Sequence, residues 1–593
     1  MIYFHNSYMK RLFLLLLLTI AVNVQAQLRP FHMSQVRLEE SRWRDNMVRD
    51  SAWMCSFTTQ QLLHSMRTTA GVYSAYEGGY DAFPKMGGWE SLDCDLRGHA
   101  VGHLLSAFAY MYAGTGEEIF RLKGDSIVQG IRECQRMIGT GYVSAFPEGL
   151  INRNLQGKSV WAPWYTLHKL MMGLRMQHEL AGNDTAAVIL RDFTDWALRK
   201  LNGADRGKVL RNEFGGIAEA IPELHDFFYH ADKIDPLYAS NFDMGTLHCN
   251  TFLPKVVVES QCSDEGRRMA DAFFREMVAH HCYASGSLSD KEHFFPPETM
   301  SRHLSGYTGE SCCTYNMLRL VRTLYPYQHD DPIYMDYYER ALVNHILGQQ
   351  DPKSGMVHYF LPMLTGAYKL YSTPMHSFWC CVGSGFESHA RYAESVYWHA
   401  TDTLYVNLFI PTTLTWREQG LTLTQQTDFP RSDATQLLIR EAPARRQTIR
   451  IRVPSWCTEP VVCTINGKRQ KVQPDQGYCT LTRQWSKGDC VYFRFPMSLR
   501  KEYTPDSTRV AYLYGPLLLA GRLGRVEHPF SDPTKHNDYY TFNFQVPDSI
   551  KSLPASSLHP VSDFAEFETV DGIRVSPLYD IHHERYVVYW TVK

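Results

Sequence analysis

The stretch WYTLHKLMMGLRMQHEL, residues 164–180, decides the fold class of this chain. Its apolar side chains recur at three- and four-residue spacing, the period of an amphipathic α-helix, and the turn sequence Ala181-Gly182-Asn183-Asp184 follows it. Six other segments before residue 400 share this period: Arg97–Met111, Ser126–Ile138, Ala186–Leu201, Gly216–His230, Asp264–His281 and Cys313–Tyr325. Successive helices joined by short loops, without a fixed-period repeat, predict an all-α toroid or solenoid over residues 27–400.

After residue 400 the period changes to alternation of apolar and polar residues, which is typical of β-strands. Asn466-Gly467 lies between two such segments and predicts a hairpin turn. We therefore expect an antiparallel β-sandwich over residues 401–540 and a β-rich extension over residues 541–593. The segments are Leu404–Phe409, Leu421–Thr424, Thr448–Val453, Val461–Ile465, Tyr478–Leu481 and Val491–Phe495.

The bulk properties exclude some classes of partner. At 593 residues the chain is too long for one hydrophobic core, so several domains are expected. The formal net charge is −2 and no basic block is present, which argues against a nucleic-acid partner. The sequence contains no obvious coiled-coil pattern, so the oligomeric state stays open.

The first 26 residues have the pattern of a secretory signal peptide. Lys10 and Arg11 precede an apolar run, Leu12–Val22, and Val24-Gln25-Ala26 resembles a cleavage site. This run is too short to span a membrane, and no later segment reaches spanning length. We expect an exported protein, periplasmic or extracellular, without a stable membrane span.

Two pairs of adjacent cysteines stand out among the 14 in the chain. Cys312-Cys313 follows Glu310-Ser311, and Cys380-Cys381 lies far downstream, before Gly383 and Gly385. Three thiolates and one carboxylate would complete a tetrahedral zinc site. Glu310 and Cys312 would share one side of an extended segment, and a kinked loop would let both downstream cysteines reach the metal. A redox pair and two sets of buried thiols are the alternatives.

Two further stretches place polar groups among apolar ones. Glu292, within Ser289–Phe294, is a carboxyl group among aromatic residues, surroundings that raise a carboxyl pKa; the alternative is a surface acid. His99 and His103 share one helix face at i, i+4 spacing. A metalloprotease would need Glu where Ala100 stands, so peptidase activity is not expected. These histidines either face a polar pocket or lie in the core.

Taken together, the motifs resemble the β-L-arabinofuranosidase families, glycoside hydrolase families 127 and 146. The resemblance covers nearly the whole mature chain and implies an (α/α)6 barrel followed by β-sandwich modules. It is carried, in this order, by Gly87-Gly88-Trp89-Glu90, Arg97–His103, Trp164–Lys169, Glu213-Phe214-Gly215-Gly216, Glu310-Ser311-Cys312 and Cys380–Gly385.

The resemblance also implies an activity and a site. Cys380 matches a zinc-bound nucleophile and Glu292 the acid/base of a retaining, exo-acting hydrolase that releases L-arabinofuranose from plant glycans through a thioglycosyl-enzyme. His103 and His248 match histidines that contact the sugar. The implied zinc ligands are Glu310, Cys312, Cys380 and Cys381.

The chain departs from the family pattern at one position. Many relatives have Asn where this chain has Cys313, which leaves open whether Cys312 or Cys313 binds the metal. Glu298 lies close to Glu292 and is the alternative acid/base. Two other functions stay open: the same mechanism on another L-furanoside, such as the aceric acid of complex pectin, and a non-catalytic carbohydrate-binding protein with structural zinc.

Overall fold

A computed structural model describes residues 28–72, 83–210, 216–228, 248–525, 546–561 and 563–592. The expected signal peptide, residues 1–26, lies outside the described residues, as do Glu213, Phe214 and Gly215 of one motif. Within the described ranges, no helix combines the length and the apolar character needed to cross a bilayer.

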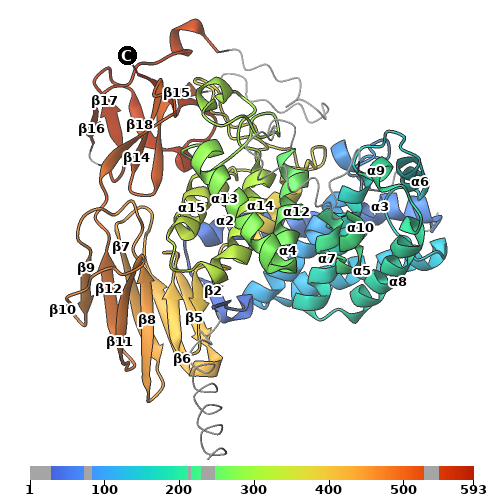
Figure 1. Cartoon of the computed structure of the whole chain (residues 1–593), viewed down its shortest axis with the longest axis horizontal. Coiled ribbons are helices and arrows are strands. Elements are labelled where there is room, and N and C mark those ends of the chain that lie inside the picture. The colour runs from blue at the N-terminus through green and yellow to red at the C-terminus, as the bar shows by residue number, and fades with distance from the viewer. Residues whose placement is uncertain are drawn as a thin grey trace, which may run out of the picture.

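The first two thirds of the described chain are helical, and Figure 1 shows these helices gathered beside the β-sheets. The prediction of a helical domain followed by β-sheet modules is confirmed. The longer helices are α2 (Arg42–Ser56), α3 (Thr59–Ala70), α4 (His99–Thr115), α5 (Glu118–Ile138), α6 (Gly149–Leu155), α7 (Pro163–Ala181), α8 (Asp184–Leu201), α12 (Cys249–Cys262), α13 (Asp264–Glu276), α14 (Ser311–Leu324), α15 (Ile333–Ala341) and α16 (Cys380–Ala390).

Local sequence explains where these helices begin and end. Pro163 opens α7 and Gly182, in the left-handed conformation at φ 70°, ends it. The expected helix Gly216–His230 is wrong as one element. Its described part forms short pieces, Gly216–Glu219, Pro222–Leu224 and α10 (His225–Phe228), because Pro222 cannot continue a helix begun before it.

Two glycines let α4 and α7 cross with their backbones in contact. A side chain at Gly102 would meet the Lys169 carbonyl oxygen at 2.3 Å, and one at Gly173 would meet the Gly102 carbonyl oxygen at 2.3 Å. Only glycine allows so close an approach. The crossing brings the first turns of both helices to the same end of the helical domain.

Two sheets follow, with strand orders β1-β3-β4-β8-β11 and β10-β9-β12-β7-β6-β5-β2. Apolar residues of both sheets share one core cluster, as a sandwich requires. The pairing is antiparallel except that β4 runs parallel to β8. The bounds are β3 (Tyr397–His399), β4 (Thr403–Val406), β5 (Thr412–Trp416), β6 (Leu421–Gln426), β7 (Ala434–Glu441), β8 (Arg446–Arg452), β9 (Val462–Ile465), β10 (Lys468–Arg469), β11 (Tyr478–Gln484) and β12 (Cys490–Arg494).

Two strands of the sandwich come from the start of the described chain. β1 (Arg29–Pro30) pairs with β3, and β2 (Val36–Leu38) pairs with β5. The expected hairpin at Asn466-Gly467 joins β9 to β10, and both turn residues have positive φ. The chain therefore enters the sandwich, leaves it for the helical domain and returns.

A third, eight-stranded sheet contains the C-terminal part of the chain. Its strands, drawn in red at the upper left of Figure 1, pair the segment before residue 525 with the tail after residue 557. The tail therefore belongs to this sheet and not to the sandwich. The strands are β13 (Leu499–Tyr503), β14 (Arg509–Tyr514), β15 (Leu517–Arg525), β16 (Leu558–Pro560), β17 (Phe567–Thr569), β18 (Arg574–Pro577), β19 (Glu584–Val587) and β20 (Trp590–Thr591).

Candidate active site and metal centre

The candidate site lies where several helices begin. Glu310 is the residue before α14, and Cys380, His99 and Cys249 are the first residues of α16, α4 and α12. The unsatisfied N–H groups of a helix N-terminus favour nearby negative charge. These helices therefore stabilise thiolates and carboxylates at the site.

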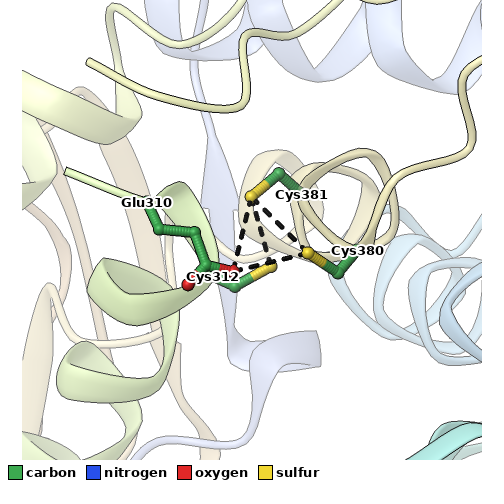
Figure 2. A group of neighbouring side chains, drawn as sticks. All are labelled: Glu310, Cys312, Cys380 and Cys381. Atoms are coloured by element: carbon green, nitrogen blue, oxygen red, sulfur yellow. Dashed lines mark hydrogen bonds between the residues drawn. The ribbon is translucent and has the colours of Figure 1, made fainter. Parts of the chain in front are cut away.

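Four side chains meet there in a compact, buried group. One ligand atom from each of Glu310, Cys312, Cys380 and Cys381 lies within 4.8 Å of all the others, and Figure 2 shows their side chains converging from the starts of two helices. Oε1 of Glu310 is 3.4 Å from Sγ of Cys380 and 3.9 Å from Sγ of Cys381. Sγ of Cys312 is 3.4 Å from Sγ of Cys381.

The local geometry differs from what spacing suggested. Cys380 and Cys381 belong to the first turn of α16, not to a kinked loop, and Gly383 is helical. Cys312 likewise lies in the first turn of α14. Gly383 is needed for another reason: a side chain there would meet Cδ2 of His103 at 2.2 Å.

Cys312 and Cys313 face different parts of the protein. Cys312 joins the four-residue group, whereas Cys313 is buried in the hydrophobic cluster that α12 and the sandwich share. Sγ of Cys312 lies 3.4 Å from Sγ of Cys381, and Cys313 is not a member of the group. The geometry favours Cys312 as the ligand. All fourteen cysteines lie in the described ranges, and each is a free thiol.

The four residues fit a soft or borderline divalent cation. Burial raises the pKa of the Cys380 and Cys381 thiols and that of the Glu310 carboxyl. Burial also acts on Cys312, but hydrogen bonds from Cys380 and Cys381 outweigh it and lower its pKa to about 7. Cys312 is therefore the thiol of the group that ionises most readily, whereas burial opposes ionisation of the other three side chains. A divalent cation would compensate their negative charges, and three sulfurs with one carboxylate suit zinc.

A fourth thiol supports the carboxylate. Sγ of Cys249 lies 2.7 Å from Oε2 of Glu310, and both side chains are fully buried. The two oxygens of Glu310 therefore serve different neighbours, Oε1 the cysteines of α16 and Oε2 the first residue of α12. Such contacts behind a ligand fix its orientation.

Tyr359 connects Cys380 to Glu292. Its hydroxyl lies 3.3 Å from Sγ of Cys380 and donates a short hydrogen bond to Oε1 of Glu292. Nucleophile and acid/base of a retaining glycosidase stand about 5 Å apart across the sugar. Two groups that share one hydroxyl are close enough to meet that requirement.

Glu292 is held in an unusual backbone conformation. Its φ is 68°, and its carbonyl oxygen accepts a hydrogen bond of 2.8 Å from the Cys249 N–H. Non-glycine residues seldom adopt positive φ, and such residues cluster at functional sites. The expectation that its surroundings raise the Glu292 pKa is wrong: burial does raise it, but hydrogen bonds from His248 and Tyr359 outweigh burial and lower it.

Glu298 stands apart from this arrangement. Its carboxylate is 62% exposed and bonds Nδ1 of His280 at 2.8 Å, whereas the Glu292 side chain is 18% exposed. Nothing in the described contacts of Glu298 links it to the cysteines. The geometry therefore favours Glu292 as the acid/base.

Both histidines suggested by the resemblance lie at the site. Nε2 of His248 is 3.3 Å from Oε2 of Glu292. His103 lies against Gly383 on α16, and its Nδ1 is 2.6 Å from Oε1 of Glu387. Its Nε2 is buried without a hydrogen-bond partner among the described residues.

Tyr359 and Glu387 are two residues of the site that were not predicted from the sequence. Glu387 follows Cys380 by seven residues, two helical turns, so the helix period could have placed both on one face. Tyr359 has no comparable signal, because a loop between α15 and α16 carries it.

Comparison with known proteins identifies the family. The GH127 β-L-arabinofuranosidase catalytic domain matches residues 35–394, and the GH127 β-L-arabinofuranosidase middle domain matches residues 403–497. A search of curated proteins found no match.

Solved structures agree in fold. A GH127 β-L-arabinofuranosidase from Geobacillus stearothermophilus T6 is 15% identical, with a TM-score of 0.69 over 94% of this chain and 100% of that one. A GH127 β-arabinofuranosidase is also 15% identical, with a TM-score of 0.67 over 96% and 99%. The chain thus belongs to glycoside hydrolase family 127, the β-L-arabinofuranosidase family.

Proposed function

We propose that this protein is a retaining, exo-acting β-L-arabinofuranosidase that removes L-arabinofuranose from plant glycans, with Cys380 as nucleophile and Glu292 as acid/base. One observation carries the proposal: Tyr359 hydrogen-bonds both Cys380, within the four-residue group, and Glu292. The shared hydroxyl supports the proposal because it keeps the two groups close together, as two-step glycoside hydrolysis requires of a nucleophile and a proton donor.

In the first step, Sγ of Cys380 bonds to the anomeric carbon while the bond from that carbon to the leaving oxygen breaks. Glu292 gives its proton to this oxygen, so the aglycone leaves as a neutral alcohol. In the second step, the Glu292 carboxylate takes a proton from water, whose oxygen bonds to the anomeric carbon. The carbon–sulfur bond breaks and the Cys380 thiolate is regenerated. Two displacements retain the configuration.

We propose that Glu310, Cys312, Cys380 and Cys381 hold a zinc ion. When bound, it would keep these buried thiols ionised near neutral pH, which burial alone opposes. Cys249 orients Glu310 from behind, and His248 and Tyr359 orient Glu292. His103, held by Glu387, would contact the sugar through its free Nε2.

Turnover of an aryl β-L-arabinofuranoside by the purified zinc-loaded protein tests this function. Nuclear magnetic resonance should show release of the β-anomer first. Cys380→Ala should abolish turnover. Glu292→Gln should lose far more activity on a methyl glycoside than on a dinitrophenyl glycoside, because a good leaving group needs no proton.

Glu298→Gln is the matched control and should keep wild-type rates. An inert wild type, an inverted product or full activity in Cys380→Ala would refute the proposal.

We also propose that the protein is exported, since residues 1–26 have the pattern of a signal peptide. Amino-terminal sequencing of the mature protein from the periplasm or medium should begin at Gln27. Retention of the intact chain in the cytoplasm would contradict export.

A further inference from the structure

Trp161 is a large aromatic side chain left in solvent beside the candidate site. It is 47% exposed, although its neighbours Trp164 and Tyr165 are buried. Its backbone N–H donates to Oδ2 of Asp95 at 3.2 Å, and the next residue, Ala162, has a left-handed backbone with φ 44°. The chain thus holds Trp161 in place at the start of α7 with a backbone conformation that alanine seldom adopts.

Trp161 is joined to the catalytic groups through one further ring. Its ring centroid lies 5.0 Å from that of the buried Trp89, in an edge contact. Trp89 in turn lies 6.3 Å from the ring of Tyr359, whose hydroxyl bonds Cys380 and Glu292. Ring contacts therefore connect Tyr359, which bonds both reacting groups, to the solvent-exposed Trp161.

Backbone hydrogen bonds hold Trp89 against the segment that precedes Cys380. The N–H of Trp89 donates to the carbonyl oxygen of Ser377 at 3.2 Å, and that of Gly87 to Met375 at 2.8 Å. Gly88 must be glycine, because a side chain there would meet the His376 carbonyl oxygen at 1.9 Å. Trp89, which contacts both Trp161 and Tyr359, is thus held by backbone contacts to the segment that leads into Cys380.

We propose that Trp161 is the stacking platform for the leaving-group side of the substrate: the sugar ring to which the arabinofuranose is attached. This rests on the proposed function. In an exo-acting enzyme only the leaving group extends from the inner pocket to solvent, and Trp161 is an exposed ring that contacts, through Trp89, the tyrosine bonded to Glu292. An exposed indole offers an apolar face to the C–H face of a sugar ring.

The platform predicts a specific kinetic signature. Stacking on a remote ring is made equally in the ground state and the transition state, so its loss raises KM and leaves kcat unchanged. Trp161→Ala should raise KM about five- to tenfold for a disaccharide of β-L-arabinofuranose linked to a second sugar. KM for methyl β-L-arabinofuranoside, which has no second ring, should change less than twofold.

Two further variants control for effects on KM that do not depend on stacking at position 161. Trp161→Phe should restore most of the disaccharide KM, because a phenyl ring can also stack. Tyr503→Ala removes an aromatic of similar exposure, 50%, from β13 of the third sheet and should leave both substrates unaffected.

Unchanged disaccharide KM in Trp161→Ala, or equal increases for both substrates, would overturn the platform while turnover by the wild type still supports the enzyme. A wild type that hydrolyses neither glycoside would refute the proposed function, and the platform with it.

Discussion

The thiol of Cys249 lies 2.7 Å from Oε2 of Glu310, the carboxylate oxygen that does not face the cysteines of α16. Cys249→Ala would leave this fully buried oxygen without its hydrogen bond. Because such contacts commonly change metal affinity ten- to hundredfold, we expect zinc to bind about tenfold more weakly. Competition with a chromophoric chelator measures this. Cys249→Ser keeps a donor and should retain most of the affinity; wild-type affinity in the alanine variant would contradict the role.

Adjacent cysteines on α14 provide a matched pair of variants. Cys312→Ser should lose the zinc ion, because the hydroxyl is a far poorer ligand than a thiolate. Cys313→Ser should keep it, since Cys313 faces the hydrophobic cluster instead, and should cost only stability. Elemental analysis of the two purified proteins distinguishes them. Full zinc content in Cys312→Ser, or none in Cys313→Ser, would reverse the assignment.

Tyr359→Phe tests the hydroxyl shared by Cys380 and Glu292, the proposed catalytic groups. Its hydrogen bond helps to lower the Glu292 pKa, so its removal should raise that pKa. Glu292 must be protonated to act as an acid, and the alkaline limb of the kcat/KM profile reports its ionisation. This limb should move to higher pH, with kcat about tenfold lower. An alkaline limb that stays in place, or moves to lower pH, would show that Tyr359 does not act on Glu292.

Glu387 links the acid stability of the helical domain to His103. Burial raises its pKa, but the hydrogen bond from His103 and the charge of Arg391 outweigh burial and lower it to about 2. A carboxyl with a lower pKa in the folded state stabilises the fold above its unfolded pKa of about 4.3, and this stabilisation is lost as pH falls toward 2.

Glu387→Gln should therefore reduce the free energy of unfolding by about 3 kcal/mol at pH 7. The difference from wild type should shrink as pH falls below 4. Chemical denaturation at several pH values measures it, and a constant difference across this range would contradict the linkage.

The part of the candidate site that lies in short motifs could be predicted from the sequence, and the part that distant segments supply could not. The four residues of the buried group come from two short motifs, and their donor atoms alone indicate a sulfur-rich metal site. Cys249 and Tyr359 reach it from distant segments, and no spacing rule connects Cys249 to Glu310 across 61 residues. Likewise the pKa of Glu292 depends on His248 and Tyr359, which only the folded chain brings near.

The fold, like the site, could be predicted from the sequence only in part. Helical and strand periods place most elements, and Asn466-Gly467 forms the expected turn. The parallel pairing of β4 with β8 and the membership of the tail in a third sheet depend on contacts between distant strands. Periodicity identifies a strand but carries no information about its partner.

β1 and β2 have a consequence for engineering this enzyme. Each is an edge strand of a different sandwich sheet, although both precede the helices along the chain. A sandwich produced without the helical part and the residues before it would lack β1 and β2. Their partners β3 and β5 would then expose unpaired N–H and C=O groups, which promote aggregation. The helices and the sandwich therefore form one structural unit, and an exchange between homologues must include both.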